Sequence, residues 1–277
     1  MQIILGEEIF EKENNPLENF FYNNRNQLIQ KDVVLAPWTH WLNTKAPILE
    51  QLKNDNTFFG KCATILQHCK YWEFEELFLK LGITAVVNPT PDLKKKTKLA
   101  LIPCPYVTTL TLSPTQPKNI ECSYIGAKTH AVRANMLNFA EEPNWHIVVR
   151  NQYHNYERDI AKKVKKEKEY CDVIERSKFV LCPRGFAPGS VRFWETLAAG
   201  AVPILSADDW ILPNIGLEDI IIRIPEAEFC KERVKKEIGK ISETEWLRLS
   251  LQTRAMYINY TESGAINYVN NQLCKIT

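Results

Sequence analysis

The chain has 277 residues, of which 45% are hydrophobic and 25% are charged, and a formal net charge of +2. This length accommodates one large domain or two domains of roughly 120 to 150 residues each, and the composition is ordinary for a globular protein. The near-neutral charge argues against a general polyanion binder, because nucleic-acid-binding modules usually carry a strong basic excess.

The first half of the chain alternates short apolar runs with helical patterns. Trp72–Leu81 has the apolar spacing of a helix, and Gly82 is placed to end it. Residues 108–118 (TTLTLSPTQPK) combine prolines with hydroxyl residues and are typical of a linker. The predicted strands of this half are Ile3–Leu5, Asp32–Ala36, Ala63–Leu66 and Thr84–Val87.

A second series of strands and helices follows the linker. The run Lys162–Lys168 is basic, but Glu157, Glu167 and Glu169 flank or interrupt it, which favours a solvated helix face over a nucleic-acid-binding or membrane-binding one. The predicted elements are strand Cys122–Ile125, a turn at Gly126, helix Arg133–Phe139, strand His146–Val149, helices Tyr156–Lys168 and Lys168–Arg176, strand Lys178–Cys182, helix Val191–Ala199, strand Val202–Leu205 and the helical stretch Glu243–Cys274.

The segment 174–213 concentrates charge in one loop and the start of one helix. Arg184 and Gly185 follow a strand, and Ser190 is placed to cap a helix that carries Arg192 and Glu195 on nearly the same face. A helix N-terminus, with free N–H groups and a partial positive charge, favours a phosphate. A cation for phosphate beside a carboxylate for sugar hydroxyls is what a nucleotide-sugar site needs.

These motifs resemble the exostosin family, glycosyltransferase family 47. A weaker match is the strand Cys122–Ile125 with Gly126 and the following Arg133, and before residue 120 the likeness is confined to Val33–Trp38. The family's Ser-Lys-Phe, Pro-Arg-Gly, Ser-x-Arg-Phe-x-Glu, Val-Pro-Val/Ile and Leu-Pro motifs recur, in order and with matching gaps, at Ser177–Phe179, Pro183–Gly185, Ser190–Glu195, Val202–Ile204 and Leu212–Pro213.

Alternating strands and helices predict an α/β architecture with parallel sheets. We expect two Rossmann-like domains, an acceptor-binding domain at residues 1–117 and a nucleotide-sugar-binding domain at residues 118–277. Since ligands collect at the carboxyl ends of parallel strands, both should face a shared cleft. This is the GT-B arrangement that the resemblance also implies, and a return of the last helix to the first domain would fit it.

The resemblance implies transfer, with inversion, from a nucleoside-diphosphate sugar to a glycan hydroxyl. We expect a UDP-sugar, such as UDP-xylose, UDP-galactose or UDP-glucuronic acid, and the residues leave the identity of the sugar open. The chain has no Asp-x-Asp motif, so we expect arginines, not a metal or other cofactor, to neutralise the leaving diphosphate. For each arginine the alternative is a surface ion pair, and Glu195 could bind ribose or simply pair with Arg192. The donor-site candidates are Gly126, Arg133, Arg150, Arg184, Gly185, Ser190, Arg192 and Glu195, with Asp208 and Asp209 ranked lower.

The catalytic base is expected at the carboxyl end of a first-domain strand. His40 leads because an imidazole titrates near neutrality without special tuning, although it could also be a packed structural residue. Trp38 and Trp41 could form a platform for an acceptor sugar or belong to the core. The alternative bases are His68, Asp92 and Glu73.

Two further readings stay open. One is a catalytically silent nucleotide- or glycan-binding partner subunit on the same scaffold, and a weaker one is a nucleotide-sugar epimerase. The eight cysteines form no Cys-x-x-Cys pair, which argues against structural zinc. Residues 1–15 lack the basic flank and long apolar core of a signal peptide, and no window approaches a membrane span of roughly 18 apolar residues, so we expect a soluble, cytoplasmic protein.

Overall fold

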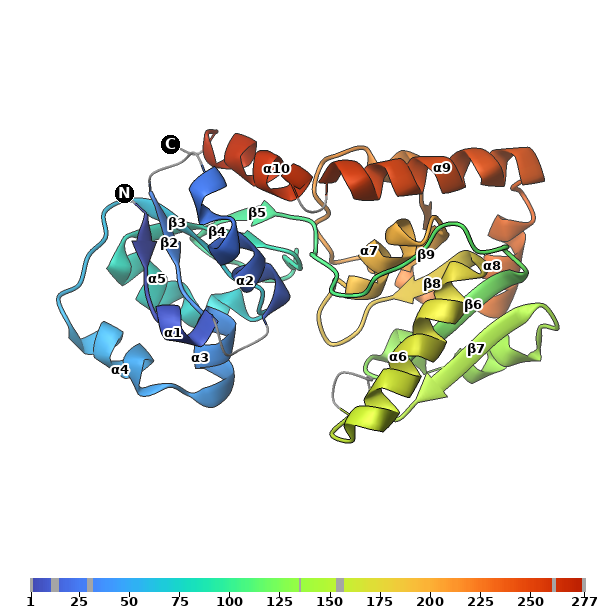
Figure 1. Ribbon diagram of the computed structural model, residues 1–277, viewed down its shortest axis with the longest axis horizontal. Coiled ribbons are helices and arrows are strands. Elements are labelled where there is room, and N and C mark those ends of the chain that lie inside the picture. Colours follow the sequence, from blue (N-terminus) through green and yellow to red (C-terminus); the bar gives the residue numbers. More distant parts are fainter. Residues whose placement is uncertain are drawn as a thin grey trace. The chain divides into compact units, whose positions relative to one another are not determined.

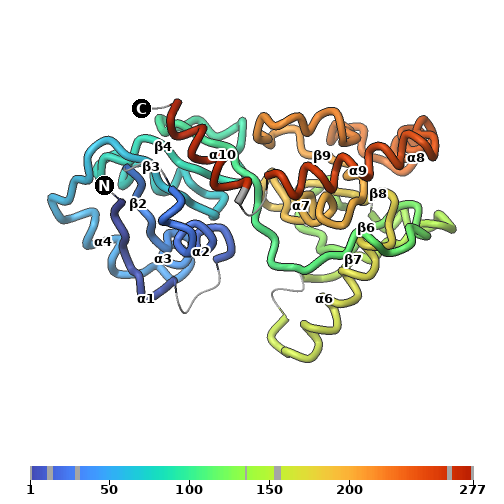
Figure 2. Tube along the Cα trace, turned by 45° about the horizontal axis from the view of Figure 1, so that its top comes forward, coloured from blue at the N-terminus to red at the C-terminus, as the bar shows by residue number. Residues whose placement is uncertain are grey.

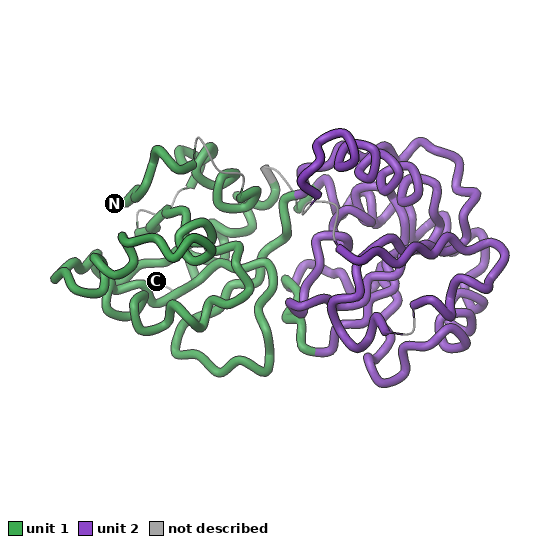
Figure 3. The backbone as a smooth tube through the Cα atoms, turned by 90° about the horizontal axis from the view of Figure 1, so that it is seen from below, with its two compact units in different colours: residues 1–107, 209–213, 259–277 green, residues 108–208, 214–258 purple. Residues whose placement is uncertain are grey.

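The computed structural model describes residues 2–10, 15–28, 32–134, 136–152, 157–260 and 263–275. The chain forms two compact units (Figure 3). Unit 1 comprises Met1–Val107, Asp209–Pro213 and Asn259–Thr277, and unit 2 comprises Thr108–Asp208 and Asn214–Ile258. Each unit contains a five-stranded parallel sheet with helices around it (Figure 1). The prediction of two Rossmann-like α/β halves is therefore confirmed.

The sheet of unit 1 follows the order of the sequence. Its strands are β1 (Ile3–Ile4), β2 (Val33–Leu35), β3 (Cys62–Ile65), β4 (Ile83–Asn88) and β5 (Ala100–Pro103), paired in parallel in that order. The first four were predicted, and β5 was missed. The sequence signal for β5 is weak because only a short apolar run lies between Lys98 and Pro103. The strand lies at the edge of the sheet and pairs with β4 alone.

Helices of unit 1 enclose one continuous apolar cluster on the sheet. Trp38, Trp41, Phe74 and Phe78 pack there against residues of β2, β3 and β4. Gly82 ends α5 as predicted, with φ of 86°, a conformation that favours glycine. The helices are α1 (Glu7–Phe10), α2 (Pro16–Asn23), η1 (Arg25–Gln27), α3 (Trp38–Thr44), α4 (Pro47–Asn54), η2 (Tyr71–Phe74), α5 (Glu75–Leu81) and α10 (Ser263–Leu273).

The sheet of unit 2 has a reversal in its strand order. Its strands are β6 (Ile120–Ala127), β7 (Trp145–Arg150), β8 (Ser177–Pro183), β9 (Val202–Ser206) and β10 (Ile222–Arg223), in the order β10-β9-β8-β6-β7. The chain runs outward in one direction from β6 to β7 and in the other from β8 to β10. The point between β6 and β8 is a topological switch point, where open α/β sheets bind ligands at the carboxyl ends of their strands.

Helices of unit 2 depart from the sequence reading in several places. The two predicted helices around Lys168 are one helix, α6 (Ile160–Glu175), because no glycine or proline interrupts the run; Tyr156 lies outside the described residues. The predicted helix 133–139 consists of 3-10 turns, and Gly126 lies inside β6 instead of forming a turn. The remaining elements are η3 (Ala131–Arg133), η4 (Met136–Glu141), α7 (Val191–Ala198), η6 (Leu217–Asp219), η7 (Glu226–Glu228), α8 (Lys231–Ile238) and α9 (Glu243–Tyr260).

The predicted final helical stretch is two helices, α9 and α10. Helix α9 runs beside the end of α7 (Figures 1 and 2), where Ser250 Oγ donates to Gly200 O and Arg254 Nη1 donates to Ala198 O. In unit 1, Asn270 of α10 donates to Gln27 O at 2.9 Å. Within the described ranges, no helix is both long and apolar enough for a membrane crossing.

Candidate functional site

Arg133 joins the two strands that flank the switch point. Its Nη1 donates to Ala127 O, at the end of β6, and to Thr129 Oγ1, both at 3.0 Å. Its Nη2 donates to Pro183 O, at the end of β8, at 2.8 Å. The guanidinium is buried, so it fixes the two carboxyl ends at the place where a ligand is expected.

Arg192, in the first turn of α7, also contacts the carboxyl end of β6. Its Nη2 donates to Ile125 O at 2.7 Å, and its guanidinium lies 4.5 Å from the ring centroid of Tyr124. Arg133 lies 5.9 Å from the same ring. A Cβ on Gly126 would lie 2.3 Å from Arg192 Nη2, so glycine is needed for this close approach.

The two guanidiniums form a buried cationic centre. Burial, with a further contribution from the charge of Arg192, lowers the pKa of Arg133 to about 10, which leaves it protonated at neutral pH. Among the described residues, Arg133 Nε and the Nε and Nη1 atoms of Arg192 have no hydrogen-bond partner. Buried donors without acceptors are costly, and an anion would satisfy both the donors and the charge.

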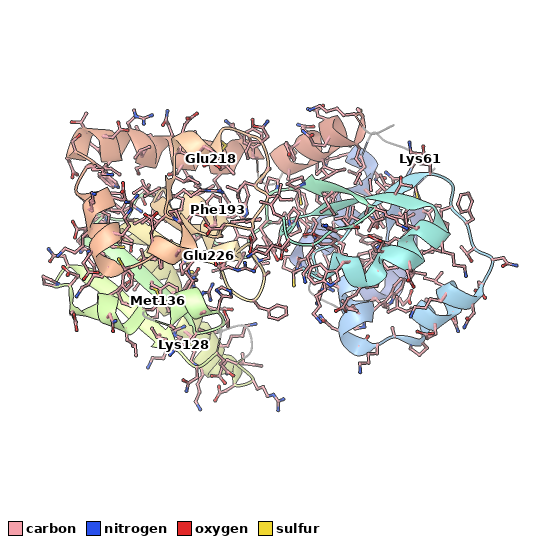
Figure 4. The ribbon with its side chains drawn as sticks, turned by 180° about the vertical axis from the view of Figure 1, so that it is seen from behind. Lys61, Lys128, Met136, Phe193, Glu218 and Glu226 are labelled. Carbon is pink, nitrogen blue, oxygen red and sulfur yellow. The ribbon has the colours of Figure 1, made fainter. Side chains whose placement is uncertain are left out.

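Arg184 and Gly185 form the turn after β8. Arg184 N donates to Ser206 O at 2.8 Å, and its Nη1 lies 3.7 Å from Glu226 Oε1 (Glu226 is labelled in Figure 4). A Cβ on Gly185 would lie 3.2 Å from Arg133 Nη2. The turn therefore packs tightly against the Arg133 guanidinium, with Glu226 as the acidic neighbour of Arg184.

Ser190 stands at the N-cap position of α7, but its side chain makes no capping hydrogen bond, which corrects the predicted cap. Its backbone is extended, with φ of −144° and ψ of 132°. The first-turn N–H groups of the helix are thus not satisfied by this hydroxyl, and a helix start of this kind is suited to an anion.

Glu195 is enclosed within unit 2. Only 2% of it is exposed, and its Oε2 accepts a hydrogen bond from the Tyr170 hydroxyl of α6. Burial raises the pKa of Glu195 to about 7, against the lowering effects of the Tyr170 hydrogen bond and the Arg192 charge. In this arrangement the carboxylate links α7 to α6 and faces a tyrosine, where a ribose was expected.

Arg150 and the lower-ranked donor candidates Asp208 and Asp209 have partners within the protein. Arg150 forms an ion pair with Glu169 of α6 at 2.6 Å, which is the alternative that the sequence left open for it. The Asp208 carboxylate accepts from Glu226 N, whereas Asp209 belongs to unit 1 and pairs with Lys94 at 2.7 Å. Over the described ranges, no group of three or more His, Cys, Asp or Glu side chains is placed to hold a metal ion.

Three of the base candidates follow the carboxyl ends of unit 1 strands, as expected. His40 lies on α3, after β2. His68, after β3, accepts from Lys70 N through Nδ1, and burial lowers its pKa. Asp92, after β4, is buried and accepts from Lys94 N at 2.8 Å. Glu73 instead lies in η2 and pairs with Lys70 at 2.9 Å.

Trp38 and Trp41 are core residues, with 0% and 2% of their surfaces exposed. Trp38 Nε1 donates to Thr64 Oγ1 at 2.7 Å, and the two indole rings pack edge to face at 5.3 Å. Neither ring has a face open to an acceptor sugar, so the core alternative is correct for both. Their aromatic area stabilises the helix–sheet packing of unit 1.

Glu18 was not singled out from the sequence. It is 2% exposed, and its carboxylate accepts hydrogen bonds from Thr39 N, Thr39 Oγ1 and Gln67 N, beyond the ends of β2 and β3. The available signal was its place on α2 beside buried Leu17 and Phe21. Nothing in the local sequence says that loops from two other elements donate to it.

Residues 109–236 match the Exostosin GT47 domain model, a range that includes the switch point, Arg133 and the whole of α7. This part of the chain is similar to an exostosin GT47 domain. It is similar to the Exostosin-1 homolog of Caenorhabditis elegans, with 51% identity over 45 residues, which cover 16% of this chain and 12% of that protein. It is also similar to "Probable glucuronosyltransferase Os01g0926700" of Oryza sativa subsp. japonica, with 46% identity over 65 residues.

The second stretch covers 22% of this chain and 16% of the rice protein, so the matched part is a small share of each relative. Among solved structures, the chain is similar to the trehalose-6-phosphate phosphatase N-terminal domain of Candida albicans. The identity is 11% and the TM-score 0.49, over 94% of this chain and 74% of that one.

Proposed function

We propose that this chain is a glycosyltransferase that moves a sugar from a UDP-sugar to a glycan hydroxyl. The observation that carries the proposal is Arg133, which ties the carboxyl ends of β6 and β8 together at the switch point of the matched GT47 domain. In this proposal unit 2 binds the donor and unit 1 binds the acceptor. The name of the rice relative makes glucuronic acid the first sugar to test. Xylose and galactose, which the family resemblance suggests, are tested next.

The diphosphate would lie against the turn after β8 and the start of α7. Arg184 and the Ser190 end of α7 would contact its oxygens, while Arg133 would supply positive charge beneath them. Arg192 and Gly126 would act as positioning residues, because Arg192 already donates to Ile125 O and packs on Tyr124. Guanidinium groups and a helix N-terminus neutralise a leaving diphosphate without a divalent ion.

The proposed reaction is a single displacement. The acceptor oxygen attacks the anomeric carbon of the sugar, and the bond from that carbon to the diphosphate oxygen breaks. UDP leaves with the bonding electrons, and the proton of the acceptor hydroxyl passes to a base of unit 1. Attack opposite the leaving group inverts the anomeric configuration. His40, His68 and Asp92 are the bases proposed, since each follows the carboxyl end of a unit 1 strand.

A calorimetric titration tests the donor site directly. We expect UDP to bind the full chain and to raise its melting temperature, with the same affinity in the presence of a chelator. UDP-sugar turnover should then be measured with UDP-glucuronic acid, UDP-xylose and UDP-galactose against a panel of oligosaccharides. Binding that disappears on chelation would refute metal independence, and absence of both binding and transfer would refute the proposed function.

A further inference from the structure

Two segments of unit 1, the first turn of α3 and the loop after β3, donate hydrogen bonds to the carboxylate of Glu18 on α2. Its Oε1 accepts from Thr39 N at 3.1 Å, from Thr39 Oγ1 at 2.5 Å and from Gln67 N at 3.1 Å. Thr39 lies in the first turn of α3, after β2, and Gln67 follows β3. A residue of α2 therefore holds the start of α3 and the loop after β3 at the carboxyl edge of the sheet.

Gln67 also accepts a hydrogen bond from α2, so Glu18, Thr39 and Gln67 form a hydrogen-bonded junction. The side-chain Oε1 of Gln67 accepts from Leu17 N, in the first turn of α2, at 2.7 Å. The start of α2 is thus satisfied by a residue of another loop, and that same residue donates its own N–H to Glu18. Helix α3 and the loop after β3 also carry His40 and His68, each one residue beyond a partner of Glu18.

We propose that Glu18 is a positioning residue that sets the geometry of the acceptor edge, where the base of the reaction stands. This inference rests on the proposed function for its catalytic consequence. A buried carboxylate that receives three donors is an effective junction only while it is ionised, because a protonated carboxyl has lost acceptor capacity and gained a donor. Glu18 itself is enclosed and acts through the loops that it holds.

The ionisation of Glu18 falls in an accessible range. Burial raises its pKa to about 7, against the lowering effects of the hydrogen bonds from Thr39 and Gln67. The titratable side chains next to Thr39 and Gln67 are His40, His68, Cys69 and Lys70. In the described structure, none of them is among the groups that shift the pKa of Glu18. Below this pH the junction should loosen.

The first experiment uses hydrogen exchange and needs no activity. In Glu18→Gln, the side-chain N–H group would face the N–H and hydroxyl donors of Thr39 and Gln67, which it cannot accept from. We therefore expect faster hydrogen exchange at the backbone amides of Thr39 and Gln67 than in the wild type. The exposed Glu8→Gln on α1 is the matched control and should leave these amides unchanged. Unchanged exchange at both amides in Glu18→Gln would overturn the inference.

The second experiment separates binding from turnover in the full chain. Glu18→Gln should leave the Kd for UDP unchanged and lower kcat or raise the acceptor KM by about tenfold or more, the size of effect that follows from misplacing a base. The wild type should lose activity as the pH falls through about 7, and in Glu18→Gln only the part of this acid limb that comes from protonation of the base itself should remain. Unaltered transfer with an unaltered pH profile would overturn the inference.

A second pair of variants covers the case in which Glu18→Gln fails to fold. Thr39→Val removes the hydroxyl donor, and Thr39→Ser keeps it, so only Thr39→Val should reproduce the kinetic defect. Equal kinetics for these two variants would count against Glu18. A wild-type chain that binds UDP but transfers no sugar would instead refute the proposed function, and hydrogen exchange would then decide whether the junction exists.

Discussion

The Nη2 atom of Arg133 donates to the carbonyl oxygen of Pro183 at 2.8 Å, across 50 residues of sequence. Because its Nη1 holds Ala127 O, one side chain fixes the separation of the two strands at the switch point. A single buried cation therefore shapes the floor of the proposed donor site and contributes its charge.

Arg133→Ala should weaken UDP binding by about tenfold to a hundredfold. It removes the positive charge beneath the diphosphate and the charge-assisted hydrogen bonds, worth roughly 1.5–3 kcal/mol, that hold the ends of β6 and β8 together. Isothermal titration with UDP measures the change. Arg176→Ala is the control, since Arg176 pairs with Asp172 on the exposed face of α6. Equal UDP affinity in Arg133→Ala and the wild type would contradict the placement of the diphosphate.

Gly126→Ala should destabilise unit 2 by about 1–3 kcal/mol, the usual cost of overpacking a filled site. The added methyl would meet Arg192 Nη2 at 2.3 Å and the Tyr124 hydroxyl at 2.8 Å. Urea unfolding measures the loss. Gly239→Ala serves for comparison, because that glycine is exposed with a helical φ of −64° and should change stability little. A fully stable Gly126→Ala would show that Arg192 can move away.

The buried carboxyl of Glu195 predicts a pH dependence of stability. Its pKa is about 7 in the folded state, against the ordinary glutamate value of 4.5, so the folded state binds the proton more tightly than the unfolded state. The stabilisation is present below pH 4.5 and is lost as the pH rises towards 7. Glu195→Gln should remove this pH dependence, so the wild type should lose stability relative to the variant as the pH rises over that interval. Denaturant unfolding at intervals of pH tests it, and parallel curves would refute it.

Trp38→Phe should destabilise unit 1 by about 1–3 kcal/mol, because it leaves the buried Thr64 hydroxyl without a donor and a gap in the core. Trp72→Phe, at a half-buried position, is the comparison and should cost less. The melting temperature and the acceptor KM are both measured. A raised KM at unchanged stability would restore the acceptor-platform interpretation.

The base should be identified by His40→Ala, His68→Ala and Asp92→Asn, made one at a time. One of them should lower kcat by about a hundredfold or more while UDP affinity stays at the wild-type value. Single-turnover transfer and UDP titration provide the two readings. Full activity in all three would move the base to a residue outside this set.

The sequence alone determined the α/β class, most strand positions and the resemblance of residues 174–213 to a nucleotide-sugar site. Apolar runs, glycines at helix ends and motif spacing are local properties, and they fix local structure such as β8, α7 and the turn at Arg184.

Tertiary structure decided which of these side chains are enclosed and which partners they meet. Trp38 and Glu195 are buried because distant elements cover them, and Glu18 became a candidate because loops after β2 and β3 both donate to it. Arg133 matters because β6 and β8 are neighbours although β7 lies between them in sequence. Hydrogen bonds between residues far apart in the chain depend on strand order and burial, and no local pattern of amino acids encodes either.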